Sequence, residues 1–400
     1  MRVLAAHNRY QFGGGEDAVF RDETELLRMH GHTVRLFEED NDAIQGVRGK
    51  LIAAASIFYS TGARRRMREA IEEFAPDVLH VHNWFPVLSP SIVMEAGAMG
   101  IPVVQTLHNY RMLCANAMLY RDGRICTDCV GKSPIFKSIL HGCYRGSRAG
   151  SAIVSAAYDL HRLARTWDNV DLFIAVSEFQ RELLVRGGLP AEKIVVKPNF
   201  CSFSSPVNGA EREDHALYVG RLSVEKGIVT LLEAWSSGKI PIRLKIVGDG
   251  PLASEVRRFV GRNGAVEYLG QQPPEMVYRE MARARFLVFP SEWYETFGRT
   301  VVEAFSQGTP VLAADLGCMR GLVEDGVTGY RFEPGNAESL AAGALRFPSG
   351  EAYRQMEANC RDLFEKKYTA ERNYAYLTEI YRRAIELGRW RGGLPVYNRE

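Results

Sequence analysis

Two cations and two carboxylates in the second half of this 400-residue chain have residue types and spacing that suit ligand binding. Arg221 and Lys226 lie close together in the sequence, and two such cations on a loop can flank a diphosphate. Glu295 and Glu303 follow later, and a carboxylate accepts paired hydrogen bonds from the vicinal hydroxyls of a sugar or ribose. Each pair also has a plainer explanation. The two cations can be ordinary charges on a solvated surface, and Glu303 can form an ion pair with Arg299 on a helix.

The elements around these residues are predicted to place them at one edge of a parallel sheet. Residues 286–289 form an apolar run that stops at Pro290, and an amphipathic helix is expected from about Gly298 to Gly308. Residues 216–219 predict another strand directly before the cationic loop. Ligands bind at the carboxyl ends of the strands in open α/β sheets, and a helix N-terminus favours an anion. We therefore expect a phosphate near Gly298.

The acidic stretch resembles the signature of the retaining glycosyltransferases of family 4, also described as glycosyl transferases group 1. The residues that carry the resemblance are Glu295-Thr296-Phe297-Gly298 and, further on, Glu303-Ala304-Phe305. The loop from Gly220 to Gly227 is similar to the diphosphate-binding loop of that family. The resemblance implies that Glu295 holds hydroxyls of the donor sugar, that Glu303 holds the ribose, and that Arg221 and Lys226 hold the diphosphate. It also implies donor contacts from Gly14, Gly15, Gly248, Gly250, Leu269, Thr296, Phe297 and Gly298.

Polar residues in the first half are expected to complete the site. Arg2 to Ala6, Val78 to His82 and Val103 to Leu107 are predicted strands, and polar residues follow each of them. A glycine-rich loop over residues 11–17 follows the first strand, but its spacing is not that of a dinucleotide fingerprint, and a plain tight turn is the alternative. The resemblance implies that His108 acts beside the donor sugar and that the acceptor side includes Glu16, His82, Asn83 and Arg111.

Four cysteines within one short stretch predict a structural zinc site. The pattern Cys-x11-Cys-x2-Cys-x13-Cys places four thiolate ligands in reach of one ion: Cys114, Cys126, Cys129 and Cys143. Thiols that bind no metal are the alternative. Such a closed site would shape a loop and take no part in the reaction, for which we expect no cofactor. His80 and His82 share one side of a strand, and without a third ligand we interpret them as core or cleft lining.

The distribution of charge along the chain indicates which partners the protein can bind. The formal net charge of +2 is too small to indicate a nucleic-acid partner. Residues 44–68 contain no acid and six basic residues, which are Arg48, Lys50, Arg64, Arg65, Arg66 and Arg68. This segment either rests on an anionic membrane surface or forms a solvated helix face. A second basic group suits the diphosphate of a lipid-linked acceptor or is ordinary surface charge: Lys132, Lys137, Arg145 and Arg148.

Neither a signal peptide nor an apolar run of ~20 residues is visible. We expect a cytoplasmic protein, peripheral on the inner face of the membrane if the basic segment binds lipid.

The fold class expected from these patterns is α/β, and the resemblance implies the GT-B architecture of two Rossmann-like parallel-sheet domains facing a central cleft. We expect an acceptor domain at residues 1–198, which includes a cysteine-rich loop at 111–148. A nucleotide-sugar domain is expected at 199–369, and a helix within 370–400 should cross back to the first domain.

The implied activity is that of a glycosyltransferase of hexosyltransferase type. It would move a sugar, with retention, from a nucleotide-diphosphate donor to a hydroxyl of a saccharide or lipid-linked acceptor in cell-surface polysaccharide biosynthesis. The alternatives are a nucleotide-sugar epimerase of the same architecture and a catalytically silent binding scaffold.

Overall fold

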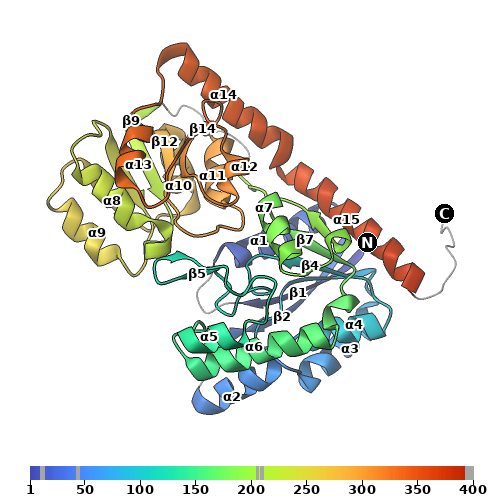
Figure 1. Ribbon diagram of the computed structural model, residues 1–400. Helices are drawn as coiled ribbons and strands as arrows, with labels where there is room; N and C mark the ends of the chain where they lie inside the picture. The colour runs from blue at the N-terminus through green and yellow to red at the C-terminus, as the bar shows by residue number, and fades with distance from the viewer. Residues whose placement is uncertain (10–13, 42–45, 204–206, 208–210, 392–400) are drawn as a thin grey trace. The chain divides into compact units, whose positions relative to one another are not determined.

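In the computed structural model the chain forms two compact α/β units (Figure 1). The structure describes residues 1–9, 14–41, 46–203, 207 and 211–391, so residues 11–13 of the predicted glycine-rich loop lie outside the described residues. The first unit comprises Met1–Met118, Thr127–Pro198 and Asn373–Glu400. The second unit comprises Leu119–Cys126 and Asn199–Arg372, so part of the cysteine-rich loop groups with the second half of the chain.

The first unit is built on a six-stranded parallel sheet. Its strands, in order across the sheet, are β2 (Thr33–Asp40), β1 (Arg2–Arg9), β3 (Val78–Asn83), β4 (Val103–Leu107), β7 (Leu172–Ala175) and β8 (Ile194–Val196). All residues of β3, β4 and β7 are buried, as expected for strands that are covered on both faces.

The second unit contains another six-stranded parallel sheet. Its strands, again in spatial order, are β11 (Val266–Gly270), β10 (Arg243–Val247), β9 (Glu213–Val219), β12 (Ala284–Phe289), β13 (Val311–Ala314) and β14 (Gly329–Phe332). A short hairpin of β5 (Tyr120–Arg121) and β6 (Arg124–Ile125) belongs to the same unit.

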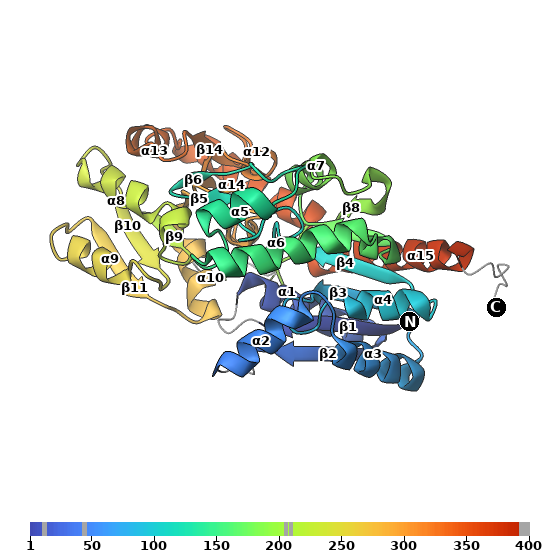
Figure 2. The ribbon, with the colours of Figure 1, turned by 60° about the horizontal axis from the view of Figure 1, so that its bottom comes forward.

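Helices connect the strands of the first unit and cover its sheet (Figures 1 and 2). They are α1 (Gly15–Met29), α2 (Gly46–Ser56), α3 (Thr61–Phe74), α4 (Ser91–Ala98), α5 (Ile135–His141), α6 (Arg148–Leu163), α7 (Glu178–Arg186) and, from the end of the chain, α15 (Ala370–Arg391). Leu377, Tyr381 and Ala384 of α15 share one buried cluster with Val3 and Val78, so this distant helix completes the first core.

The helices of the second unit are α8 (Ile228–Ser236), α9 (Ala253–Val260), α10 (Pro274–Arg283), α11 (Arg299–Ser306), α12 (Met319–Leu322), α13 (Ala337–Ala344) and α14 (Gly350–Lys367). Trp235 of α8, Val256 of α9 and Leu340 of α13 pack in one cluster with Leu244 and Val288 of the sheet. The two parallel-sheet units confirm the predicted α/β class. In the described part of the chain, no helix combines the length and apolar character needed to cross a bilayer.

Candidate functional site

The cationic loop and the acidic loop of the second unit meet at the carboxyl ends of neighbouring strands. Arg221 follows β9, and Glu295 lies in the loop after β12, which pairs directly with β9. The Tyr218 hydroxyl donates a 2.8 Å hydrogen bond to the Arg221 carbonyl, which fixes the backbone while the arginine side chain stays exposed. Parallel strand pairing therefore unites two motifs that lie far apart in the sequence.

Lys226 and Glu295 form a direct ion pair. Lys226 Nζ lies 2.6 Å from Glu295 Oε1, and the Ser291 hydroxyl donates to the same oxygen at 2.7 Å. The lysine ammonium also lies 5.3 Å from the centroid of the Trp293 ring. Only 8% of Glu295 is exposed, so its carboxylate is held in place before any ligand arrives.

The loop between Glu295 and α11 is anchored by a buried thiol. Cys318 Sγ donates to the carbonyls of Glu295 at 3.1 Å and Phe297 at 3.0 Å. Phe297 is buried and Thr296 is half-buried. The N-cap residue of α11 is Gly298, which has no side chain to bond the first amides, so these amides can receive an anion.

Glu303 pairs with Arg299 one turn earlier on α11, as its plainer interpretation predicted. The Arg299 Nε donates to Glu303 Oε1 at 3.0 Å, and both side chains are largely buried. The ion pair with Arg299 orients the Glu303 carboxylate. The contact of Glu303 with a ribose stays a prediction.

Two glycines allow the loops of this site to approach each other closely. At Gly227, with φ of +70°, an added Cβ would lie 1.9 Å from the Pro290 carbonyl oxygen. At Gly248, with φ of +138°, it would lie 1.9 Å from the Gly220 carbonyl oxygen. Gly250 lies in the same turn after β10, and Leu269 lies half-buried on the neighbouring strand β11.

In the first unit, predicted site residues gather at the carboxyl ends of β3 and β4. His82 Nδ1 lies 3.1 Å from His108 Nε2, and the Asn83 amide donates to the Asn8 carbonyl at 2.7 Å. Gly14 and Gly15 are exposed at the start of α1, and Glu16 Oε2 accepts a 3.3 Å hydrogen bond from Asn109.

The histidines of this group are neutral near pH 7. Burial, followed by the charges of nearby histidines and Lys197, holds the pKa of His80 and His82 well below the usual 6.5. Burial, followed by the charges of His7 and Lys197, lowers the pKa of His108 to about 3. His108 is therefore available as a neutral hydrogen-bond partner and does not supply a proton as an imidazolium.

Arg111 is held against aromatic side chains. Its guanidinium carbon lies 3.9 Å from the centroid of the Phe85 ring. Burial raises the pKa of Tyr158 to about 12, and contact with Arg111 opposes that rise. A cation in this position suits an anionic group on an acceptor, which remains a prediction.

Family models match both halves of the chain. Residues 203–362 match the model described as glycosyl transferases group 1, and residues 14–199 match the glycosyl transferase 4-like domain. The chain belongs to the group 1 glycosyltransferases.

Individual relatives agree with this assignment. An uncharacterised glycosyltransferase of Methanocaldococcus jannaschii is 25% identical over 397 residues, which cover 95% of this chain and 98% of the relative. The O-antigen chain mannosyltransferase B of Escherichia coli is 29% identical over 51% of this chain and 58% of its own length. The lipopolysaccharide 1,2-N-acetylglucosaminetransferase of Salmonella typhimurium is 28% identical over 51% of this chain and 60% of its own length.

Solved structures share the fold. HepE of Anabaena in complex with UDP has a TM-score of 0.66 and 19% identity, covering 95% of this chain and 99% of that chain. Sucrose-phosphate synthase of Thermosynechococcus elongatus has a TM-score of 0.69 and 19% identity, covering 96% and 100%. These neighbours confirm the GT-B class for this glycosyltransferase.

A buried ion pair in the first unit of the glycosyltransferase was not predicted from the sequence. Glu23 of α1 pairs with Lys197 after β8, and both side chains are almost fully buried. His82 Nε2 lies 3.8 Å from Glu23 Oε2. The available signal was the position of Glu23 among the buried residues of α1, where an amphipathic pattern predicts an apolar side chain.

Glu23, His80 and His82 lie close enough together to hold a metal ion. Among the described residues, no other group of potential metal ligands converges in this way. Both ring nitrogens of His80 already have partners, the Tyr381 hydroxyl and the Thr106 hydroxyl, each at 2.8 Å. Glu23 already holds the Lys197 ammonium. The hydrogen-bonded core that we expected for the two histidines describes this arrangement better than a metal site.

The predicted zinc ligands lie in both units. Cys114, Cys129 and Cys143 belong to the first unit and Cys126 belongs to the second. None of the seven cysteines, all of which the structure describes, forms a disulfide, and Cys114 Sγ donates to Asn116 Oδ1 at 3.0 Å. A four-thiolate zinc site therefore stays a prediction, and elemental analysis for one zinc ion per chain would test it.

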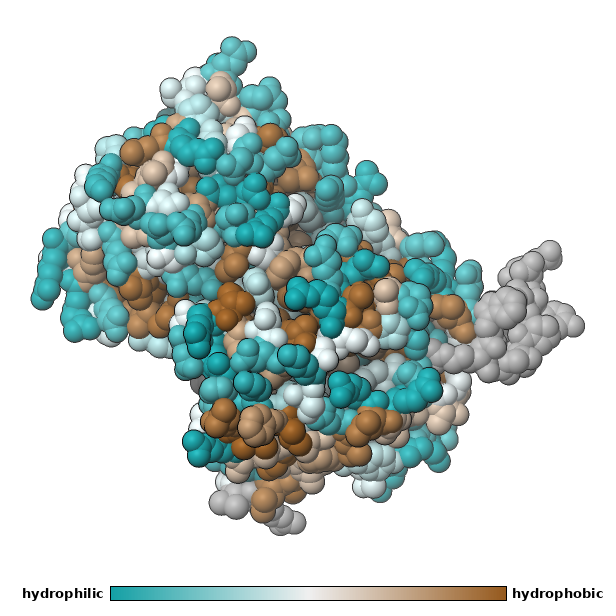
Figure 3. All heavy atoms as spheres, viewed as in Figure 1, coloured by the Kyte–Doolittle hydropathy of each residue, from teal (hydrophilic) through white to brown (hydrophobic). Residues whose placement is uncertain are grey.

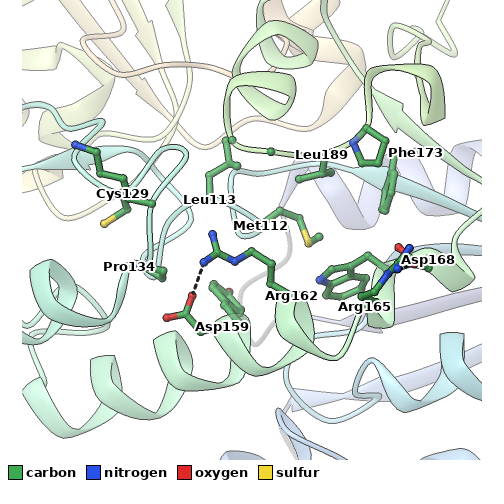
Figure 4. A pocket seen from close by; sticks show the side chains of 16 residues that line it. Met112, Leu113, Cys129, Pro134, Asp159, Arg162, Arg165, Asp168, Phe173 and Leu189 are labelled. Atoms are coloured by element: carbon green, nitrogen blue, oxygen red, sulfur yellow. Dashed lines mark hydrogen bonds and ion pairs between the residues drawn. The ribbon is translucent and has the colours of Figure 1, made fainter.

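Cys129 also lines a pocket of about 180 Å³ beside α6 (Figure 4). The pocket combines apolar residues such as Met112, Leu113 and Phe173 with the cations Arg162 and Arg165. These cations lie near carboxylates, Arg162 at 3.8 Å from Asp159 and Arg165 at 2.7 Å from Asp168. The pocket contains none of the residues predicted to bind the donor.

The first basic segment forms α2 and α3, and the arginines of α3 lie near carboxylates of the same unit. Arg64 and Arg68 of α3 both pair with Glu95, whose side chain is fully buried. Arg66 pairs with Glu39, and Arg65 lies 3.7 Å from Glu69. The charge of α3 is therefore balanced locally. Whether the segment rests on an anionic membrane or forms a solvated helix face stays a prediction.

Proposed function

We propose that this glycosyltransferase moves a sugar from a nucleotide-diphosphate donor to an acceptor hydroxyl with retention of anomeric configuration. The observation that carries the proposal is the Lys226–Glu295 ion pair next to the N-terminus of α11, whose N-cap residue is Gly298. One cation, one ordered carboxylate and one helix N-terminus there can bind a phosphate and a sugar at adjacent positions.

The donor-side groups would act on the leaving diphosphate. Transfer breaks the bond between the anomeric carbon and the phosphate oxygen, and negative charge develops on the diphosphate. Arg221, Lys226 and the first amides of α11 would stabilise that charge, which is the largest kind of contribution in such reactions. A phosphate can leave without protonation by a carboxylic acid of the enzyme, so the two carboxylates do not imply a glycosidase mechanism.

The acceptor proton would pass to the departing phosphate oxygen on the same face of the sugar. The acceptor oxygen then forms its bond to the anomeric carbon on the face that the phosphate leaves, which gives retention. Glu295 would hold sugar hydroxyls, and neutral His108 would accept or donate a hydrogen bond there. Glu303 would bind the ribose.

The names of relatives and neighbours support the substrate classes. Two relatives are transferases of O-antigen and lipopolysaccharide synthesis, and HepE was crystallised with UDP-glucose. We infer a saccharide or lipid-linked acceptor in cell-surface polysaccharide biosynthesis, reached from the cytoplasmic side of the membrane.

The first experiment is a thermal-shift screen against UDP, GDP, ADP and dTDP sugars. Ligand at 100 times its dissociation constant should stabilise the protein by about 2.7 kcal/mol. Release of the nucleotide diphosphate is then measured with candidate acceptors, and NMR assigns the anomeric configuration of the product. Matched controls for Arg221→Ala and Glu295→Ala are Arg258→Ala and Glu255→Ala on the exposed side of α9.

Three results would contradict the proposal. An isomerised donor formed without acceptor would favour an epimerase, and failure to bind any nucleotide sugar would favour a scaffold. Inversion at the anomeric carbon would exclude the retaining mechanism.

A further inference from the structure

We propose that the outer face of the α5–α6 hairpin binds the surface of a membrane that contains anionic lipid. This hairpin face consists of Ile135, Phe136, Leu140, Ile153, Leu160 and Leu163, all of which are exposed. All of these residues lie in the first unit. Membrane binding by this face does not depend on the transfer reaction, because it can be measured without a donor.

Helix α6 has one buried side and an opposite side that is apolar as well. Ser151, Val154 and Tyr158 lie on the buried side. One stripe follows the opposite side at helical spacing and contains no charged or hydroxyl group: Ala149, Ala152, Ile153, Ala156, Leu160 and Leu163. Leu160 is 48% exposed and Leu163 78% exposed. A surface helix normally presents polar residues to water, so this stripe indicates a surface that an apolar partner covers.

Helix α5 extends the apolar surface. Phe136 is 71% exposed, and α5 packs against α6 with the hydroxyls of Ser138 and Ser155 at 2.5 Å. Figure 3 shows hydrophobic side chains gathered over these two helices at the lower edge of the view. The end of α2 lies beside α6, since His161 Nε2 bonds the Ile57 carbonyl at 2.9 Å. Nine of the eighteen exposed large apolar side chains in the described part of the chain fall within residues 51–59 and 135–163.

The stretch of sequence that contains α5 and most of α6 is rich in basic residues. Residues 129–158 contain no aspartate or glutamate. They include four exposed cations, none of which forms an ion pair with another described residue: Lys132, Lys137, Arg145 and Arg148. This contrasts with Arg64 and Arg68, which are paired with Glu95.

The exposed apolar side chains and the nearby cations together indicate that the partner is a membrane surface with anionic lipid. Apolar side chains that insert at the headgroup level, together with cations that attract anionic lipid, are the features of an interfacial membrane-binding helix. A second copy of the chain is the weaker candidate. Joining two such hairpins would bring like charges together without an acid from residues 129–158 to balance them.

The test is cosedimentation of the full chain with vesicles of phosphatidylcholine alone or mixed with phosphatidylglycerol, at low and high salt. Leu160→Gln/Leu163→Gln reduces the apolar face while keeping helix-forming residues. Its matched control is Val229→Gln/Leu345→Gln, at exposed apolar positions of the second unit. Lys132→Gln/Lys137→Gln is compared with Arg258→Gln/Arg354→Gln, and circular dichroism checks that each variant is folded.

We expect salt-sensitive binding to the anionic vesicles and weak binding to the neutral ones. Each cation removed from the hairpin should weaken binding about fivefold. The leucine variant should lose most of its binding, and both controls should match the parent protein. Absence of binding at low salt, or equal binding by hairpin variants and controls, would overturn the proposal. A dimer that the leucine variant dissociates, without vesicle binding, would assign the face to a second copy.

Discussion

Lys226 Nζ lies 2.6 Å from Glu295 Oε1, although the two residues are separated by 69 positions in the sequence. The resemblance assigns one of them to the donor diphosphate and the other to the donor sugar. Their contact means that the groups expected to bind the two halves of the donor hold each other in position. The donor site of the second unit is therefore ordered before substrate binds, which reduces the reorganisation that catalysis requires.

Removing either member of this pair should abolish most transfer. We expect Lys226→Met and Glu295→Gln each to lower kcat/KM by about 100-fold or more, because each removes a group aimed at the donor. Stability should change by about 1 kcal/mol or less, since the lysine side chain keeps 25% of its surface in water. Steady-state kinetics and chemical denaturation measure the two effects. Near-normal kcat/KM in either folded variant would sink the assignment.

The close approach at Gly227 predicts a large effect from a single methyl group. Gly227→Ala should destabilise the second unit more than Gly238→Ala, although the two glycines have nearly equal φ angles of +70° and +68°. The control position has no atom within 4 Å of an added Cβ, whereas at Gly227 it would meet the Pro290 carbonyl at 1.9 Å. The control isolates the backbone cost of about 1–2 kcal/mol, and the clash should add about 1–3 kcal/mol. Equal loss of unfolding free energy in both variants would contradict this.

Acid should destabilise the first unit through its buried histidines. The pKa of His82 is held well below 6.5 in the folded state, so the unfolded state binds more protons as the pH falls. The stabilisation is complete above pH 6.5 and is lost as the pH falls from 6.5 toward the folded pKa. Each such histidine contributes a slope of about 1.4 kcal/mol per pH unit in that window.

The histidine effect can be isolated by substitution. Chemical denaturation between pH 7.5 and pH 5 should show a shallower loss for His82→Asn than for the parent protein, by about 1.4 kcal/mol per unit. His141→Asn, at an exposed position of α5, is the matched control and should keep the parent slope. An unchanged slope in His82→Asn would show that His82 does not bind more protons on unfolding.

Replacing only one partner of the Glu23–Lys197 pair should lower the free energy of unfolding strongly. Lys197→Met leaves a buried carboxylate without its ammonium partner and should lower the free energy of unfolding by about 3–5 kcal/mol. The double variant Glu23→Gln/Lys197→Met should lose less than Lys197→Met alone. Lys366→Met removes an exposed pair with Asp362 on α14, and we expect a loss below about 1 kcal/mol. Similar losses for the buried and exposed pairs would argue against an uncompensated buried charge.

Local patterns predicted several of the strands and helices that form the site. The apolar run Val103 to Leu107 predicted β4 with the bounds that the structure shows, and the run Val78 to His82 predicted all of β3 except Asn83. The helix from about Gly298 was also predicted, and it begins at Arg299. These signals are readable in sequence because burial and helix capping depend on residues that are close together in the chain.

The sequence by itself determined the two α/β halves and the motifs of a group 1 glycosyltransferase, because both are written in local periodicity and short motifs. Only the tertiary structure decided which charges meet. It joined Lys226 to Glu295, Lys197 to Glu23, and Arg64 and Arg68 to Glu95. It also left the apolar stripe of α6 on the surface. Strand order and helix packing bring distant residues within ångströms, and residue spacing along the chain does not encode those distances.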